Sequence, residues 1–232
     1  MTWNTGMTEW NKSESKRYKQ VEDYIMQHLK KEHSIAFLQQ IPYKYKDEDA
    51  KWKEHDLFME LKKTFSEENG YCITCNNTYN NGYITMMTIA IAVKDSIEPS
   101  NKQTYPKNTP TNRECAVWFY GLNILSIHAK NGKDNKDYLK SINGQADIIL
   151  GDFNAGNYME SENRFTFNNI LKEHVCICNV PTRIDPSSER RTCIDHIFIR
   201  ENLVTRCSNM RVHEDIMFSD HFPLTFEMEF ED

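Results

Sequence analysis

The stretch that most constrains the fold is residues 146–156, which read Ala-Asp-Ile-Ile-Leu-Gly-Asp-Phe-Asn-Ala-Gly. Ala146 to Leu150 is a short, largely apolar run, typical of a strand buried on both faces. The run stops at Gly151, and a glycine-framed turn follows in which Asp152 and Asn154 stand two positions apart. Such a turn holds its polar side chains at the rim of a sheet, where ligands of α/β folds commonly bind.

Asp152 and Asn154 offer one carboxylate and one neutral amide on the same side of the chain. This pair suits a hard cation, or a water and a phosphate oxygen held together. Asp and Asn are also common in the turn after any strand, because their side chains hydrogen-bond the local backbone. The rest of the chain must decide between a chemical site and an ordinary turn.

The composition is that of a globular protein. The chain has 232 residues, of which 39% are hydrophobic and 27% charged, and we expect a single domain over residues 1–232. No apolar run is long enough to span a membrane, and the first residues lack the pattern of a signal peptide. Seven scattered cysteines predict reduced thiols and a cytoplasmic location. Neither Cys72–Cys75 nor Cys176–Cys178 is followed by a second pair at zinc-site spacing.

Strand patterns outnumber helix patterns, and the two interleave along the chain. We expect helices over residues 13–31, 47–65, 134–142 and 164–173. Strands are expected over residues 1–7, 34–38, 71–75, 83–94, 115–128 (two strands, or one bent around Gly121), 146–150, 175–180, 193–199 and 222–230, with a polar loop over 97–112. Two packed sheets with helices outside would bury these runs.

Several apolar runs end in polar residues suited to phosphate or metal chemistry: Asn4, Gln40, His128, Asp195 and the dipeptide Asp220-His221. A histidine can take up a proton near neutral pH, and a neighbouring carboxylate can orient it. A lone Asp-His dipeptide is usually a hydrogen-bonded pair in a loop. The joint appearance of these residues at strand ends is not explained in that way.

The set Thr-Trp-Asn, Leu-Gln-Gln-Ile, Ser-Ile-His-Ala, Gly-Asp-Phe-Asn-Ala-Gly, Ile-Asp-His-Ile and Ser-Asp-His-Phe-Pro runs in this order from residue 2 towards the C-terminus. In order and spacing it resembles the endonuclease/exonuclease/phosphatase superfamily. Asn112-Arg113-Glu114, followed by an apolar strand and His128, is most similar to the deoxyribonuclease I branch. The resemblance implies an α/β fold, a four-layer sandwich of two packed mixed β-sheets flanked by helices. It also implies a phosphodiester-cleaving site at one edge that uses Mg²⁺, with Mn²⁺ as a possible substitute.

The resemblance further implies roles for the residues at the strand ends. Asp152 and Asn154 would position the attacking water and a phosphate oxygen, and Asp195 would contact the metal or support a histidine. Asp220 would hold His221, the general base or phosphate-bound acid. The leaving oxygen would be protonated or stabilised by His128. The metal would be held by Asn4, Gln40 and Asp220, and substrate phosphates by Tyr83, Arg113, Arg183, Arg190 and Arg191.

Gln40 departs from the family pattern, in which a glutamate ends the second strand and is the main metal ligand. An amide oxygen brings no charge, and magnesium is usually held through one or two carboxylates. We therefore expect weak metal binding and weak activity. The chain is either an inactivated variant or a natural pseudoenzyme that binds without cutting. Because the other catalytic positions are intact, we favour the first explanation.

The substrate is predicted from fewer features. In-line attack of water on a phosphorus ester is common to nucleases, lipid phosphodiesterases and phosphatases. A net charge of −6 gives no overall attraction to nucleic acid, but Arg183, Arg190 and Arg191 flank the loop before Asp195. We favour endonucleolytic cleavage of DNA. We expect no insertion into a membrane, and a regulatory protein partner that restrains the activity is possible. The alternatives are a phospholipid or small-phosphoester hydrolase and a non-catalytic nucleic-acid-binding pseudoenzyme.

Overall fold

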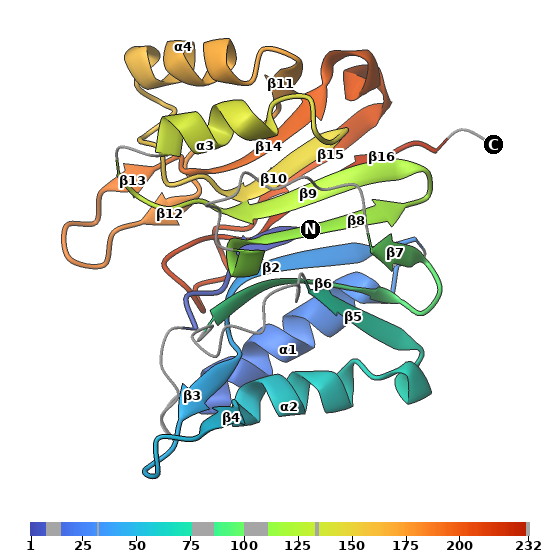
Figure 1. Cartoon of the computed structure of the whole chain (residues 1–232). Helices are drawn as coiled ribbons and strands as arrows, with labels where there is room; N and C mark the ends of the chain where they lie inside the picture. Colours follow the sequence, from blue (N-terminus) through green and yellow to red (C-terminus); the bar gives the residue numbers. More distant parts are fainter. Residues whose placement is uncertain (8–14, 32, 76–85, 100–110, 133–134, 231–232) are drawn as a thin grey trace.

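The computed structural model describes residues 1–7, 15–31, 33–75, 86–99, 111–132 and 135–230. Two six-stranded sheets pack face to face, with two helices outside each of them (Figure 1). The layers are therefore helix, sheet, sheet and helix, which confirms the predicted four-layer α/β sandwich.

The first sheet has the strand order β15-β16-β1-β2-β6-β5. Its strands are β1 (Thr2–Asn4), β2 (Ile35–Pro42), β5 (Tyr71–Cys75), β6 (Met86–Val93), β15 (Cys207–Val212) and β16 (Leu224–Met228). The neighbours β1 and β2 are parallel, and the other pairs are antiparallel. The first strand of the chain thus lies beside the last one, inside the sheet.

The second sheet has the order β11-β14-β10-β9-β8-β7. Its strands are β7 (Ile97–Pro99), β8 (Glu114–Phe119), β9 (Leu122–His128), β10 (Ile148–Asp152), β11 (His174–Cys176) and β14 (Asp195–Arg200). Only β9 and β10 are parallel neighbours in it. Residues 115–128 thus form two strands, the first of the two arrangements expected, and β10 is buried along its whole length, as its apolar run predicts.

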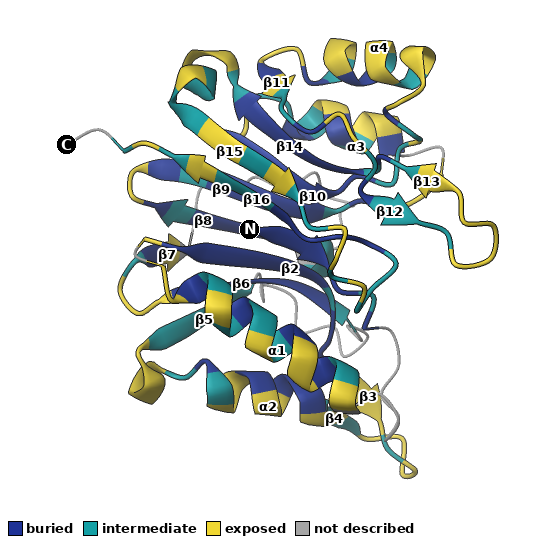
Figure 2. Ribbon diagram, turned by 180° about the vertical axis from the view of Figure 1, so that it is seen from behind, coloured by how far each residue is buried: buried dark blue, intermediate teal, exposed yellow. Residues whose placement is uncertain are grey.

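The helices cover the outer faces of the sheets through one apolar side each (Figure 2). In α1 (Ser15–Leu29), which lies within the helix expected over residues 13–31, a stripe is buried at the spacing of an amphipathic helix: Tyr18, Val21, Ile25 and Leu29. The others are α2 (Asp56–Thr64), α3 (Asn135–Ile142) and α4 (Ser161–Ile170), with short 3₁₀-helices at η2 (Glu67–Asn69), η3 (Thr111–Arg113) and η4 (Glu201–Arg206). Within the described parts of the chain, no helix is long and apolar enough to cross a membrane.

The helix predicted over residues 47–65 is wrong in its first half. A hairpin of β3 (Lys44–Lys46) and β4 (Trp52–Glu54) stands there, and its turn is closed by the Asp47 carboxylate, which accepts the backbone N–H groups of Asp49 and Lys51. The helix begins only at Asp56, because the His55 side chain accepts the N–H of Leu57 as a cap. Local turn chemistry therefore overrides the apolar spacing.

Several other expectations differ in extent. The polar loop over 97–112 begins with β7, which pairs with β8. The strand expected over 175–180 ends at Cys176, and α4 lies three residues before its predicted range of 164–173. A short hairpin of β12 (Arg183–Ile184) and β13 (Arg191–Thr192) was not predicted. Residues 13 and 14 of the first expected helix and residues 83–85 of the strand expected over 83–94 lie outside the described residues.

Candidate active site

One row of polar residues crosses the second sheet at its end. His128 of β9 lies beside Asp152 of β10, which lies beside Asp195 of β14. Residues at matching positions on neighbouring strands project from the same face of a sheet, so the three side chains meet. Gly151 lets the strands approach here: its φ is +122°, and an added Cβ would lie 2.1 Å from the Ile127 carbonyl oxygen. This close contact is why a glycine must precede Asp152.

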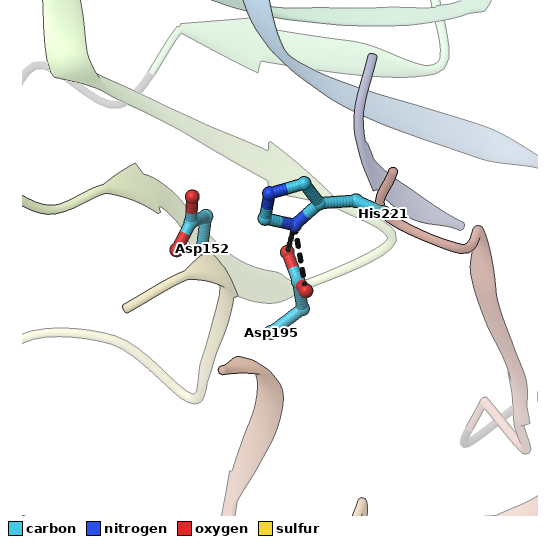
Figure 3. A group of neighbouring side chains, drawn as sticks. All are labelled: Asp152, Asp195 and His221. Carbon is cyan, nitrogen blue, oxygen red and sulfur yellow. Dashed lines mark hydrogen bonds and ion pairs between the residues drawn. The ribbon is translucent and has the colours of Figure 1, made fainter. Parts of the chain in front are cut away.

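His221 joins the row from the loop before β16. Its Nδ1 donates to the Asp195 carboxylate, with both oxygens at 2.9 Å, and its other ring nitrogen lies on the side of Asp152 (Figure 3). The residue that holds His221 is therefore Asp195, whereas the sequence suggested Asp220. The Asp220 carboxylate instead accepts from Arg183 Nε at 2.8 Å. Adjacency in the sequence suggested the wrong pair, because Asp220 and His221 engage different partners in the fold.

A pocket of about 620 Å³ opens in front of this row, within the size range of ligand sites in proteins. Nine of the predicted site residues line it: Asn4, Gln40, Arg113, His128, Asp152, Asn154, Arg183, Asp220 and His221. Asp195 lies behind His221 and is 3% exposed. The strand ends singled out in the sequence thus converge at one place.

The Asp152 side chain is held in a fixed orientation. Asn4 Nδ2 donates to its Oδ2 at 2.8 Å, and the backbone N–H of Asn154 donates to its Oδ1 at 3.0 Å. Asn154 has a φ of +47°, which an asparagine tolerates better than most residues, and its amide donates to the Ala129 carbonyl. The turn of residues 151–156 is therefore built around the carboxylate.

Burial dominates the electrostatics of the pocket. It raises the pKa of Asp152 to about 7, and the neighbouring Asp195 carboxylate adds to the shift. Burial, with the Arg113 cation, lowers the pKa of His128 to about 3. For His221 burial alone would lower the pKa, but Asp195 raises it to about 9. At neutral pH His128 is therefore uncharged and His221 is a cation, so the two histidines differ in charge.

Gln40 enters the pocket through an irregularity in β2. The register with β6 shifts between Leu38 and Ile41, and Gln40 has a φ of +59°. Its neighbour Gln39 points between the sheets and donates to Thr2 and Ser126. The Gln40 amide nitrogen lies 3.4 Å from His128 Nε2. A non-glycine residue at positive φ costs free energy and marks a position that the surrounding fold imposes.

The predicted phosphate-binding residues divide into three groups. Arg113 and Arg183 line the pocket. Arg190 and Arg191 lie outside it on the surface, where they pair with Glu160 at 3.0 Å and Glu214 at 2.7 Å. Tyr83 lies outside the described residues.

Two residues at the site were not identified from the sequence. Thr182 donates its hydroxyl to Asp195 Oδ2 at 2.8 Å and accepts the backbone N–H of Asp195, so it fixes the carboxylate that holds His221. Lys130 lines the pocket two residues after His128. Thr182 is next to Arg183 and Lys130 lies two residues after His128, both of which were predicted site residues. This proximity in the sequence was the signal that could have identified them.

His196 faces away from the pocket, because side chains alternate along β14. Its ring is fully buried among aromatic residues and lies 5.1–5.2 Å from the rings of Phe153, Tyr158 and Phe167. Burial lowers the pKa of His196 from 6.5 to about 3. The second half of the Asp195-His196 dipeptide is therefore part of the packing beneath α4.

We expect His196 to make the fold sensitive to acid. Its pKa is lower in the folded chain, so between about pH 6.5 and 3 the unfolded chain binds the extra proton. The free energy of unfolding should fall as the pH falls through this range, by up to about 1.4 kcal/mol per pH unit for this group. Urea unfolding at a series of pH values should show a shallower fall for His196→Phe. Equal pH slopes for the two chains would contradict this assignment.

The chain is similar to one family model and to several solved structures. The family model described as "Endonuclease-reverse transcriptase" matches residues 122–225. No curated protein matches the chain in sequence. Among solved structures, the endonuclease domain of TRAS1, a telomere-specific non-LTR retrotransposon, has 17% identity and a TM-score of 0.63 over 100% of this chain and 98% of its own.

Two further structures share the fold. The 3′ phosphatase NExo from Neisseria, bound to a product DNA hairpin, has 16% identity and a TM-score of 0.64 over 99% of this chain and 98% of its own. D. rerio TDP2, in complex with a single-stranded DNA product, has 15% identity and a TM-score of 0.63 over 98% of this chain and 97% of its own. The chain therefore shares the fold of these three structures, and the family model matches part of its second half.

Proposed function

We propose that this protein is a divalent-metal-dependent phosphodiester hydrolase whose substrate is DNA, cut endonucleolytically. The observation that carries the proposal is the Asp195–His221 pair, held beside Asp152 in a pocket that also contains Asn4, Asn154 and His128. Two of the similar structures were solved with DNA products, and a third is an endonuclease domain, which supports DNA over other phosphoesters.

The donor atoms of the pocket fit one divalent cation, but weakly. Ligand atoms of Asp152, Asp195 and His221 lie within 4.8 Å of one another, although the last two already bond each other. Asp152 is a buried carboxylate without a full positive charge bonded to it, and a cation would compensate its charge. We propose that Asn4, Gln40, Asp152 and Asp220 hold Mg²⁺ or Mn²⁺. The bound ion would neutralise charge on a phosphate oxygen.

The other catalytic roles belong to side chains of the pocket and to Asp195 behind it. The Asp195 carboxylate fixes the His221 ring and stabilises its cation, so that the free ring nitrogen can bind a phosphate oxygen or exchange a proton with the attacking water. Asp152 and Asn154 orient that water. A neutral His128 can donate a hydrogen bond to the leaving oxygen, which favours stabilisation over full protonation there.

Gln40 favours a second candidate, a nucleic-acid-binding protein that does not cut. With Gln40 in place of a carboxylate, the cation would be held by two carboxylates, and Arg183 already engages Asp220. Because magnesium releases its waters reluctantly, this donor set predicts low occupancy. Binding of DNA without cleavage is the property that would identify this candidate.

The substrate class can be tested with one panel. The chain and its Gln40→Glu variant would be incubated with plasmid DNA, RNA, a sphingolipid and an inositol phosphate, each with Mg²⁺ and with Mn²⁺. We expect nicking of supercoiled plasmid by the variant and no turnover of the sphingolipid or the inositol phosphate. Hydrolysis of the sphingolipid or inositol phosphate without any cutting of DNA would overturn the proposal.

A further inference from the structure

Among the described residues, three cationic side chains besides the histidines line the pocket, and two of them are already engaged. Arg113 Nη1 donates to the carbonyl oxygens of His128 and Ala129, at 3.1 and 3.4 Å. Arg183 Nε donates to the Asp220 carboxylate at 2.8 Å. These bonds hold the two guanidinium groups in place in the lining of the pocket. The third cation, Lys130, has no ion pair or side-chain hydrogen bond with any described residue.

The backbone of Lys130 is nevertheless fixed in place. The buried Asn135 amide donates to the Lys130 carbonyl at 2.7 Å and to the Phe153 carbonyl at 2.8 Å, so it bridges the segments that follow His128 and Asp152. Ala129 adds a second link, because its N–H donates to the Asp152 carbonyl at 2.8 Å. An ammonium group without a partner among the described residues thus stands on an anchored backbone at the pocket rim.

We infer that Lys130 is the residue that binds a phosphate of the nucleic acid strand beside the scissile bond. This inference rests on the proposed function and adds a substrate contact to it. An unpaired lysine on a long stem acts as a mobile point charge, which suits a backbone phosphate and carries no base information. Lys130 is a positioning residue: it aligns the strand, while the buried residues act on the reacting phosphate.

The experiment measures binding of a fluorescent DNA duplex to the full-length chain and to its Lys130→Ala, Lys130→Arg and Lys136→Ala variants, from 50 to 200 mM salt. Loss of one phosphate contact should weaken binding to all duplex sequences alike. Between 50 and 200 mM salt, the affinity of the original chain should fall by a factor about 3.5 times larger than that of Lys130→Ala. This factor is the contribution of one released counterion over a fourfold change of salt. Lys130→Arg should keep the original salt dependence.

Lys136 is the matched control. It is exposed in the first turn of α3, six residues along, and it does not line the pocket, so Lys136→Ala removes the same charge without the contact. Equal salt dependence for the original chain and Lys130→Ala, with DNA binding retained, would overturn this inference and leave the proposed function standing. If the original chain shows no salt-dependent binding of DNA, the proposed function fails as well.

Discussion

Gln40→Glu should increase cleavage of supercoiled plasmid in Mg²⁺ by roughly 100-fold or more. A full negative charge about 4 Å from a cation contributes several kcal/mol in a partly buried site, and each 1.4 kcal/mol is a factor of ten. The side chains have nearly the same shape, and the strained position at φ +59° is kept, so the carboxylate would occupy the place of the amide. The measurement is the nicking rate over a titration with Mg²⁺.

Gln40→Asn is the control for this gain, since it alters the side chain at the same position but adds no charge. It should remain as weak as the original chain. Absence of cleavage by the glutamate form in both Mg²⁺ and Mn²⁺ would contradict the explanation that Gln40 inactivates the chain. The non-cutting binder would then be the better account.

Asp195→Asn, made in the Gln40→Glu background, should lower the cleavage rate by roughly 10³- to 10⁴-fold, the scale known for a carboxylate that orients a catalytic histidine. The substitution removes the charge that stabilises the His221 cation and exchanges one acceptor oxygen for a donor. Affinity for DNA should change little, because Asp195 lies behind His221 and does not line the pocket. Single-turnover rates and duplex binding, measured together, separate the two effects.

Asp220→Asn gives the contrast. The proposed role of Asp220 is to hold the metal, so its loss should be relieved in part by more Mg²⁺, whereas the loss of Asp195 should not. Equal responses of the two variants to Mg²⁺ would show that the two aspartates share one role, and the division drawn from the hydrogen bonds would then be wrong.

The sequence was sufficient for those parts of the fold in which a local pattern determines the outcome. The apolar stripe of α1 and the buried run of β10 formed as predicted, because burial of a continuous apolar face decides both. The hairpin of β3 and β4 was missed for the converse reason. Its aromatic and lysine residues fit a helix pattern equally well, and a single turn at Asp47 decided between the two.

The site shows a similar division. The residues that gather in the pocket could be named because each follows an apolar run, and Gln40 was identified as the exception in the same way. The partner of His221 was predicted to be Asp220, and Asp195 was named only as a metal contact or as a support for a histidine; the structure shows Asp195 in this place. That choice depends on the register of β10 with β14, which places Asp195 beside Asp152, and register is a property of the packed sheets. Lys130 belongs to none of the motifs from which the site residues were predicted.

The place of β1 in the first sheet affects the order in which the molecule is completed. β1 lies between β2 and β16, the Trp3 indole donates to the His221 carbonyl, and the Ser219 hydroxyl donates to the Asn4 carbonyl. A chain emerging from the ribosome must therefore hold β1 without its neighbour β16 until residues 224–228 have been made. No fragment that stops before residue 221 can contain the whole site.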